Sequence, residues 1–96
     1  MQKLSFKLLE DINKKYNIKH NPDSIFLHLA EEVGEVAREL SKKQKNWRDE
    51  FDKEKLGEEL SDAISQILII AQDNDIDMDK AYQNKLIKIK QRFDIK

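Results

Sequence analysis

Two pairs of acidic residues in this sequence stand at a spacing that can bring four carboxylates together. Glu32 and Glu35 are three residues apart, and so are Glu59 and Asp62. On a helix, residues at this spacing are neighbours on one face, and each pair lies beside a stripe of apolar residues. If the two helices pack antiparallel, the four carboxylates converge near the middle of both. Such a group repels itself or takes up protons unless a cation neutralises it.

The donors in this group are all oxygen atoms, which is the ligand set that Mg²⁺ and Mn²⁺ prefer. Zinc is normally held by His or Cys, and a di-iron bundle requires a His three residues after its Glu, which neither helix has. Gly34 and Gly57 favour the same interpretation, since a glycine inside a helix costs about 1 kcal/mol against Ala and usually marks close approach of a ligand or backbone. The alternative is a set of solvated carboxylates paired with Lys and Arg, as is usual in a chain that is 39% charged.

Helices must position these residues, and the sequence predicts helices throughout. One proline and two glycines occur in 96 residues, and apolar residues recur at every third or fourth position. The predicted helices cover residues 2–17, a segment from a cap at Asp23 or Ser24 to residue 43, residues 54–74, and residues 78–92 with Asp77 as cap. Residues 42–53 form a polar connection with room for a short helical turn. We therefore expect an all-α fold, a small four-helix bundle-like domain that spans residues 1–96.

The third predicted helix also indicates self-association. Residues 67–71 are apolar around the whole circumference of the helix, with Ile69 as the expected outward position. A helix that is apolar all round must be covered on both sides, which four short helices cannot easily do. We therefore expect a homodimer or a dimer of dimers. The alternative is that this helix is simply central within its own chain.

Composition narrows the classes of partner and location. The net charge is −1 and the charges are interspersed, so nothing indicates binding to nucleic acid or to an anionic membrane surface. Charges also interrupt the N-terminal segment, and no apolar run approaches membrane-spanning length. The chain has no cysteine, which excludes disulfides and thiolate metal sites. We expect a cytoplasmic protein.

The order of these motifs resembles the MazG-type all-α nucleotide pyrophosphohydrolases. The pattern Glu-Glu-x-x-Glu at residues 31–35 is followed by Glu-x-x-Asp at residues 59–62, and a last helix, AYQNKLIKIKQRF, follows in family order. The likeness covers nearly the whole chain. It extends to the small single-domain forms that include the dCTP pyrophosphatases, which show a similar His-x-Pro before the second helix.

The resemblance implies hydrolysis of a nucleoside triphosphate between its α- and β-phosphates, giving a monophosphate and pyrophosphate. By the same resemblance Glu32, Glu35, Glu59 and Asp62 are ligands of Mg²⁺, with Mn²⁺ as a substitute. Glu31 matches an acidic residue that orients or activates water. The sequence has no Walker-type glycine loop, so the metal and basic side chains would have to hold the phosphates.

Four further positions are candidates for contact with the substrate, and three of them, Lys85, Arg92 and His20, match positions of the family. Lys85 and Arg92 fall in the last helix, where solvated basic residues near a helix C-terminus are an equal alternative. His20 matches the His-x-Pro motif, or is an ordinary loop histidine. Trp47 can stack on a base or pack over the core. The sequence departs from the family at Ile89, where an asparagine is expected. It departs from the dCTP-type relatives at Lys42 and Gln66, where those proteins have aromatic residues that flank the base, so base specificity is open.

Two other functions stay open. Phosphoribosyl-ATP pyrophosphohydrolases share the reaction and the all-α fold, although the neighbouring Lys and Tyr-His of that branch are absent here. The other is a non-catalytic helical interaction module, such as a regulatory partner of a toxin or nuclease, whose acidic face is only surface and which would need no metal.

Overall fold

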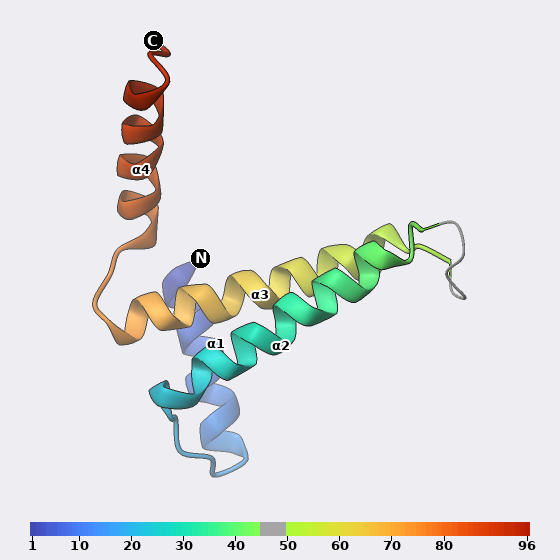
Figure 1. Cartoon of the computed structure of the whole chain (residues 1–96). Helices are drawn as coiled ribbons and strands as arrows, with labels where there is room; N and C mark the ends of the chain where they lie inside the picture. The colour runs from blue at the N-terminus through green and yellow to red at the C-terminus, as the bar shows by residue number, and fades with distance from the viewer. Residues whose placement is uncertain (45–49) are drawn as a thin grey trace.

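The computed structural model describes residues 1–44 and 50–96. These residues form four helices and no strand: α1 (Gln2–Lys15), α2 (Pro22–Ser41), α3 (Lys53–Asp73) and α4 (Met78–Arg92). The predicted all-α fold and its four helices are confirmed (Figure 1). No helix in the described part of the chain is long and apolar enough to cross a membrane.

Side-chain hydrogen bonds fix where the helices begin, and they correct the predicted N-cap of α2. α2 begins at Pro22 because Asn21 is its N-cap: the Asn21 side chain accepts a hydrogen bond from the Asp23 backbone N–H at 3.0 Å. The expected caps, Asp23 and Ser24, instead lie in the first turn. Proline at the first helical position needs no hydrogen-bond partner for its nitrogen, so the cap moves before it. Asp77 caps α4, as predicted.

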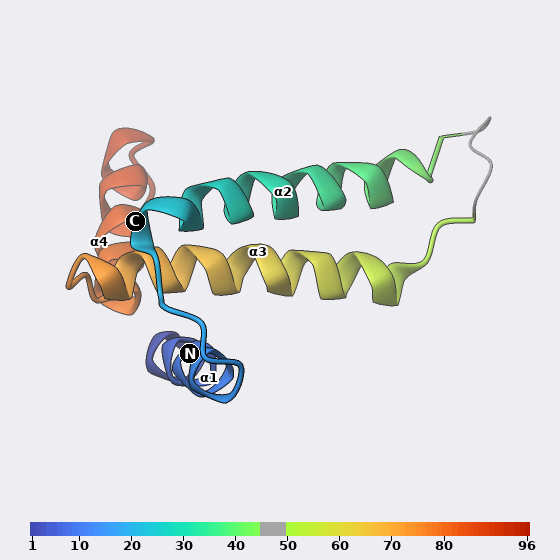
Figure 2. The same ribbon diagram turned by 90° about the horizontal axis from the view of Figure 1, so that it is seen from below.

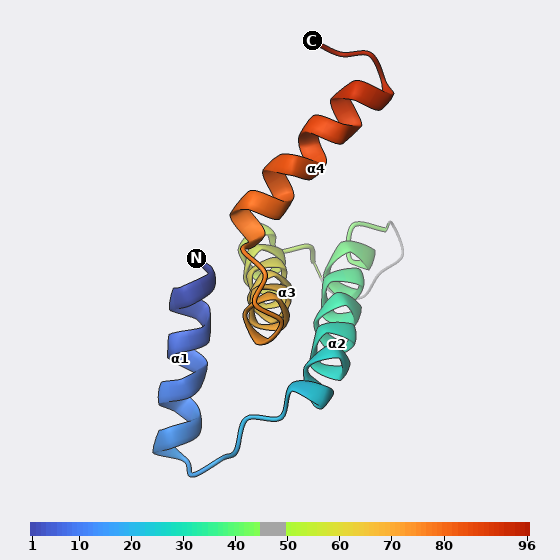
Figure 3. The same cartoon turned by 90° about the vertical axis from the view of Figure 1, so that its left-hand side faces the viewer.

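α2 and α3 form the central element of the fold. They run antiparallel and pack along their length, and α1 packs against α3 (Figure 2). α4 makes only marginal contact with the other helices and extends away from them (Figures 1 and 3). A single chain therefore does not close its helices into a complete bundle.

The apolar segment at residues 67–71 was expected to face a second chain through Ile69, but α3 buries Ile69 within its own chain. The side chain of Ile69, the predicted outward position, is only 4% exposed, and Ala71 is 2% exposed. Both are buried within their own chain because α1 and α2 pack against different sides of α3. Ile67 is the exposed member of this segment, at 41%. This segment therefore does not require a second chain.

The two glycines also lack the close approach that the sequence indicated. A Cβ atom added at Gly34 or at Gly57 would meet no atom within 4 Å in the described part of the chain. No neighbour among residues 1–44 and 50–96 therefore explains a glycine at these helical positions.

Candidate functional site

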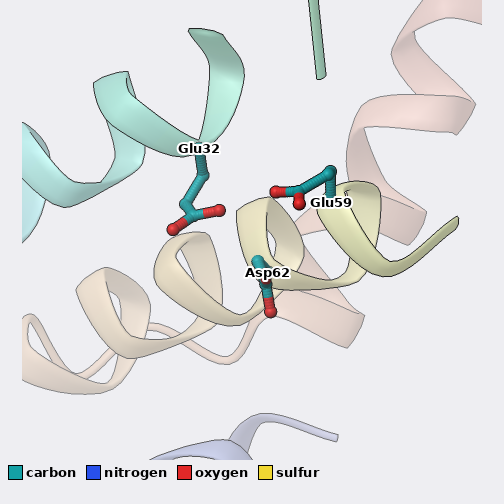
Figure 4. Close-up of side chains that lie close together, drawn as sticks. All are labelled: Glu32, Glu59 and Asp62. Carbon is teal, nitrogen blue, oxygen red and sulfur yellow. The ribbon is translucent and has the colours of Figure 1, made fainter. Parts of the chain in front are cut away.

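Three of the predicted metal ligands come together between α2 and α3. Glu32 of α2 and Glu59 and Asp62 of α3 each offer a carboxylate oxygen, and these oxygens lie within 4.8 Å of one another. Figure 4 shows the Glu32 side chain extending from α2 towards the two acidic residues of α3. We call these three residues the acidic group. Glu32 and Glu59 are half-buried and Asp62 is exposed, so the group lies at the edge of the helix–helix interface.

The position of the acidic group follows from the helical repeat. Glu32 belongs to the same stripe of α2 as the buried Ile25, two turns earlier, and this stripe faces α3. Glu59 lies on the corresponding stripe of α3, and Asp62 follows it by three residues. Antiparallel packing then sets the middle of one helix against the middle of the other, as the sequence predicted.

The electrostatics of the group favour a proton or a cation. The pKa of Glu32 is raised above its ordinary value, first because partial burial disfavours the charged form and then because Asp62, Glu59, Glu35 and Glu31 are negative neighbours. An all-oxygen donor set of this kind fits a hard divalent cation such as Mg²⁺ or Mn²⁺. The chemistry of the residues present is therefore compatible with the metal that the sequence suggested.

Two other predicted residues lie at the margin of the group. Glu35 is not among the three residues whose oxygens approach within 4.8 Å, although its charge contributes to the raised pKa of Glu32. The Glu31 side chain is exposed, and one of its oxygens lies 3.9 Å from Nδ1 of His28. Glu31 is thus free to face solvent beside the acidic group.

His20 lies elsewhere in the structure. Its Nε2 is 2.9 Å and 3.0 Å from the two carboxylate oxygens of Asp73, at the end of α3. The ring also packs edge-on against Phe6 of α1. Asp73 lies about three turns beyond Asp62, which is roughly 16 Å along the helix axis. In this structure His20 ties the α1–α2 loop to α3, a partnership that sequence spacing could not reveal.

The two predicted substrate residues of α4 are not close to the acidic group of their own chain. Lys85 and Arg92 lie on α4, which extends away from α2 and α3 (Figure 3). Trp47 lies outside the described residues.

The α2–α3 interface also contains polar groups that the sequence analysis did not assign. Glu39 is 1% exposed, and its Oε1 accepts a hydrogen bond from Nζ of Lys42 at 3.0 Å. Its Oε2 and the Oε1 of Gln66 are buried without a hydrogen-bond partner in the described part of the chain. The sequence could have indicated the burial of Glu39, because it follows Glu32 by seven residues and therefore lies on the stripe of α2 that faces α3.

Comparison with known proteins gives the family. No curated protein matches the chain closely enough to serve as a relative. The family model described as the MazG nucleotide pyrophosphohydrolase domain matches residues 20–94, from His20 before α2 to the end of α4. This match covers most of the chain and includes the acidic group, so the chain belongs to the MazG nucleotide pyrophosphohydrolase family.

Proposed function

We propose that this protein hydrolyses nucleoside or deoxynucleoside triphosphates to a monophosphate and pyrophosphate in the presence of Mg²⁺. The observation that carries the proposal is the acidic group, in which carboxylates from two helices converge within 4.8 Å in a chain of this family. In the cytoplasm such an activity would remove canonical or damaged nucleotides from the pool.

The residues would divide the chemistry as follows. Glu32, Glu59 and Asp62, with Glu35 beside them, would hold the cation. When bound, Mg²⁺ neutralises charge on the polyphosphate and on the departing pyrophosphate. Glu31, exposed at the margin of the group, would accept the proton of a water molecule as its oxygen bonds to the α-phosphorus. The bond from the α-phosphorus to the bridging oxygen breaks, and pyrophosphate leaves with the electron pair.

Substrate binding requires positive charge as well as a metal, because the substrate carries several negative charges. We propose Lys85 and Arg92 for this role, with His20 and Trp47 as contacts to the nucleoside. Since α4 extends away from its own acidic group, we propose that Lys85 and Arg92 bind substrate at the acidic group of another copy of the chain. The active form would accordingly be a homodimer or a dimer of dimers.

Product identity tests this proposal most directly. With each nucleotide and Mg²⁺, we expect equal amounts of monophosphate and pyrophosphate, without orthophosphate or a nucleoside diphosphate. In ¹⁸O-labelled water the label should enter the monophosphate. Label in pyrophosphate would instead place the attack on the β-phosphorus, and release of orthophosphate would contradict the reaction itself.

The same assay separates the alternatives. Phosphoribosyl-ATP belongs in the substrate panel, and turnover of that compound alone would identify the other pyrophosphohydrolase. Mn²⁺ should replace Mg²⁺, whereas Ca²⁺ should bind and support little turnover because it is larger and less demanding in geometry. Calorimetry with Mg²⁺ and a non-hydrolysable nucleotide covers the non-catalytic alternative: absence of heat at millimolar metal would favour a helical interaction module.

A further inference from the structure

Gln2, at the start of α1, is hydrogen-bonded to the segment that joins α3 to α4. Its Nε2 donates to Oε1 of Gln72 at 3.0 Å and to the backbone carbonyl of Ile76. Its Oε1 accepts a hydrogen bond from the backbone N–H of Met78 at 3.0 Å. These partners lie 70, 74 and 76 residues away along the chain. One side-chain amide therefore joins the first turn of α1 to the end of α3 and to the start of α4.

The end of α3 and the start of α4 are each closed by their own hydrogen bonds. Asp75 turns the backbone with a φ of 55°, and the Ile76 N–H then donates to the carbonyl of Ala71 at 2.9 Å. On the other side, the Asp77 side chain caps α4 by accepting from the Lys80 N–H at 3.3 Å. The joint between the two helices is therefore the pair of backbone torsions of Asp77, with φ −85° and ψ 102°.

Gln2 bridges this joint. The Ile76 carbonyl belongs to the peptide unit before Asp77, and the Met78 N–H belongs to the unit after it. Because each peptide unit is planar, one amide bound to both units restrains the two torsions between them. α4 makes only marginal contact with the other helices as it leaves the end of α3 (Figures 1 and 3). The direction of α4 within its chain therefore depends on this joint.

The basic residues of α4 lie far enough from the joint to be displaced by a small rotation. Lys85 and Arg92 are about 10 Å and 21 Å beyond Met78 along the helix axis. A rotation of about 20° at Asp77 would move Arg92 by roughly 7 Å. A charge-assisted hydrogen bond to a phosphate oxygen is only about 2.7–2.9 Å long, so a displacement of this size would break it.

We propose that Gln2 is a positioning residue for α4: by restraining the torsions of Asp77, it aims Lys85 and Arg92 at the substrate phosphates. The role of Lys85 and Arg92 in this proposal rests on the function proposed above. Gln2 itself acts only through α4. It precedes residues 20–94, which the family model matches, so its role is inferred from its hydrogen bonds in this structure.

Distances between spin labels test the restraint without any measurement of activity. The chain has no cysteine, so Ser61→Cys on α3 and Lys88→Cys on α4, both at exposed positions, provide the two labelled sites. Dilution with unlabelled chains isolates the distance within one chain. This distance should be narrowly distributed with Gln2 present, and its distribution should broaden or shift with Gln2→Ala. Gln83→Ala, at an exposed glutamine of α4, is the control and should leave the distribution unchanged.

Gln2→Glu keeps the test decisive if Gln2→Ala does not fold. It preserves the length of the side chain and the acceptor for the Met78 N–H, but it removes both donors. Its distance distribution should be broader than that of the wild-type chain and narrower than that of Gln2→Ala. An unchanged distribution in the folded Gln2 variants, or equal broadening with Gln83→Ala, would overturn the proposal.

Kinetics separate the aiming of α4 from the function proposed above. Gln2→Ala should raise KM roughly tenfold with a smaller change in kcat, because misplaced basic residues bind the substrate phosphates less well. Gln83→Ala should leave KM unchanged. A broadened distance with unchanged KM would refute the aiming of Lys85 and Arg92. Absence of turnover in the wild-type protein would contradict the proposed function, and the spin-label distances would still decide whether Gln2 restrains α4.

Discussion

Glu32 is the residue of the acidic group whose pKa is raised both by burial and by the charges of its neighbours. It is half-buried, and its raised pKa reflects desolvation first and four negative neighbours second. In the metal-free protein its ionised form is therefore less favourable than in the unfolded chain, whereas bound substrate and cation would make use of that charge. Activity and metal-free stability should consequently respond in opposite directions to the loss of this carboxylate.

The first prediction concerns neutral replacements within the group. Glu32→Gln or Asp62→Asn should lower kcat by at least about 100-fold, because each removes one proposed metal ligand. In EDTA, Glu32→Gln should raise stability by roughly 0.5–1 kcal/mol through relief of like-charge repulsion, or about 2–8 °C in Tm. Thermal melts and turnover measure both. Glu58→Gln, an exposed neighbour outside the group, is the control and should change neither.

Marked destabilisation of the metal-free protein by Glu32→Gln would show instead that the carboxylate is a structural ion-pair partner.

The second prediction follows from the direction of the Glu32 pKa shift. Between the ordinary pKa of a glutamate and the raised pKa of Glu32, the folded protein binds a proton that the unfolded chain has released. Stability from this group is therefore present at lower pH and is lost as pH rises through the raised pKa. The stability difference between Glu32→Gln and wild type in EDTA should grow with rising pH across this window. A difference independent of pH, measured by denaturant melts, would contradict the shift.

At the scale of elements, local pattern predicted the helices and could not predict their partners. The period of apolar residues and the caps are local properties, so Asp77 was correctly placed at the start of α4. The convergence of Glu32 with Glu59 and Asp62 followed from antiparallel packing of adjacent helices. By contrast, Ile69 was placed outward because sequence cannot show that α1 and α2 of the same chain both pack against α3.

The third prediction tests the contact between His20 and Asp73, which are 53 residues apart in the chain. Both side chains are largely buried, so His20→Ala should destabilise the protein by about 1–2 kcal/mol. Asp73→Ala should cost a similar amount, and a double-mutant cycle in urea should show coupling between the two. If His20 also contacts the nucleotide, His20→Ala will raise KM more than Asp73→Ala does. Absence of coupling in the cycle would rule out the structural contact.

At the scale of the whole molecule, the single chain carries a basic helix and an acidic surface that do not lie against each other. α4 carries Lys80, Lys85, Lys88, Lys90 and Arg92 against one acid, Asp79, while the middle parts of α2 and α3 are predominantly acidic. The family match runs to residue 94, so α4 belongs to the domain although it makes only marginal contact with its own chain. Charge complementarity between α4 of one copy and the acidic side of another would place Lys85 and Arg92 at the substrate phosphates.

The last prediction is that two inactive variants restore activity when they are combined in one oligomer. Glu32→Gln damages the acidic group and leaves α4 intact, whereas the double variant Lys85→Ala/Arg92→Ala does the reverse. If α4 acts on another copy, a mixed dimer contains one site with an intact acidic group and an intact α4. If α4 acts on its own chain, every site in the mixed dimer carries a defect. After unfolding and refolding of an equal mixture, half of the dimers are mixed and one site in each is intact, so activity should return to about a quarter of wild type.

A mixture of Glu32→Gln with Asp62→Asn is the control and should stay inactive, because both defects lie in the acidic group and no combination of chains repairs either site. Mixed oligomers without restored activity would place Lys85 and Arg92 in their own chain. Full activity of the double variant alone would remove them from the site, leaving Arg38 and Lys55, the nearest cations in sequence on α2 and α3, to hold the phosphates.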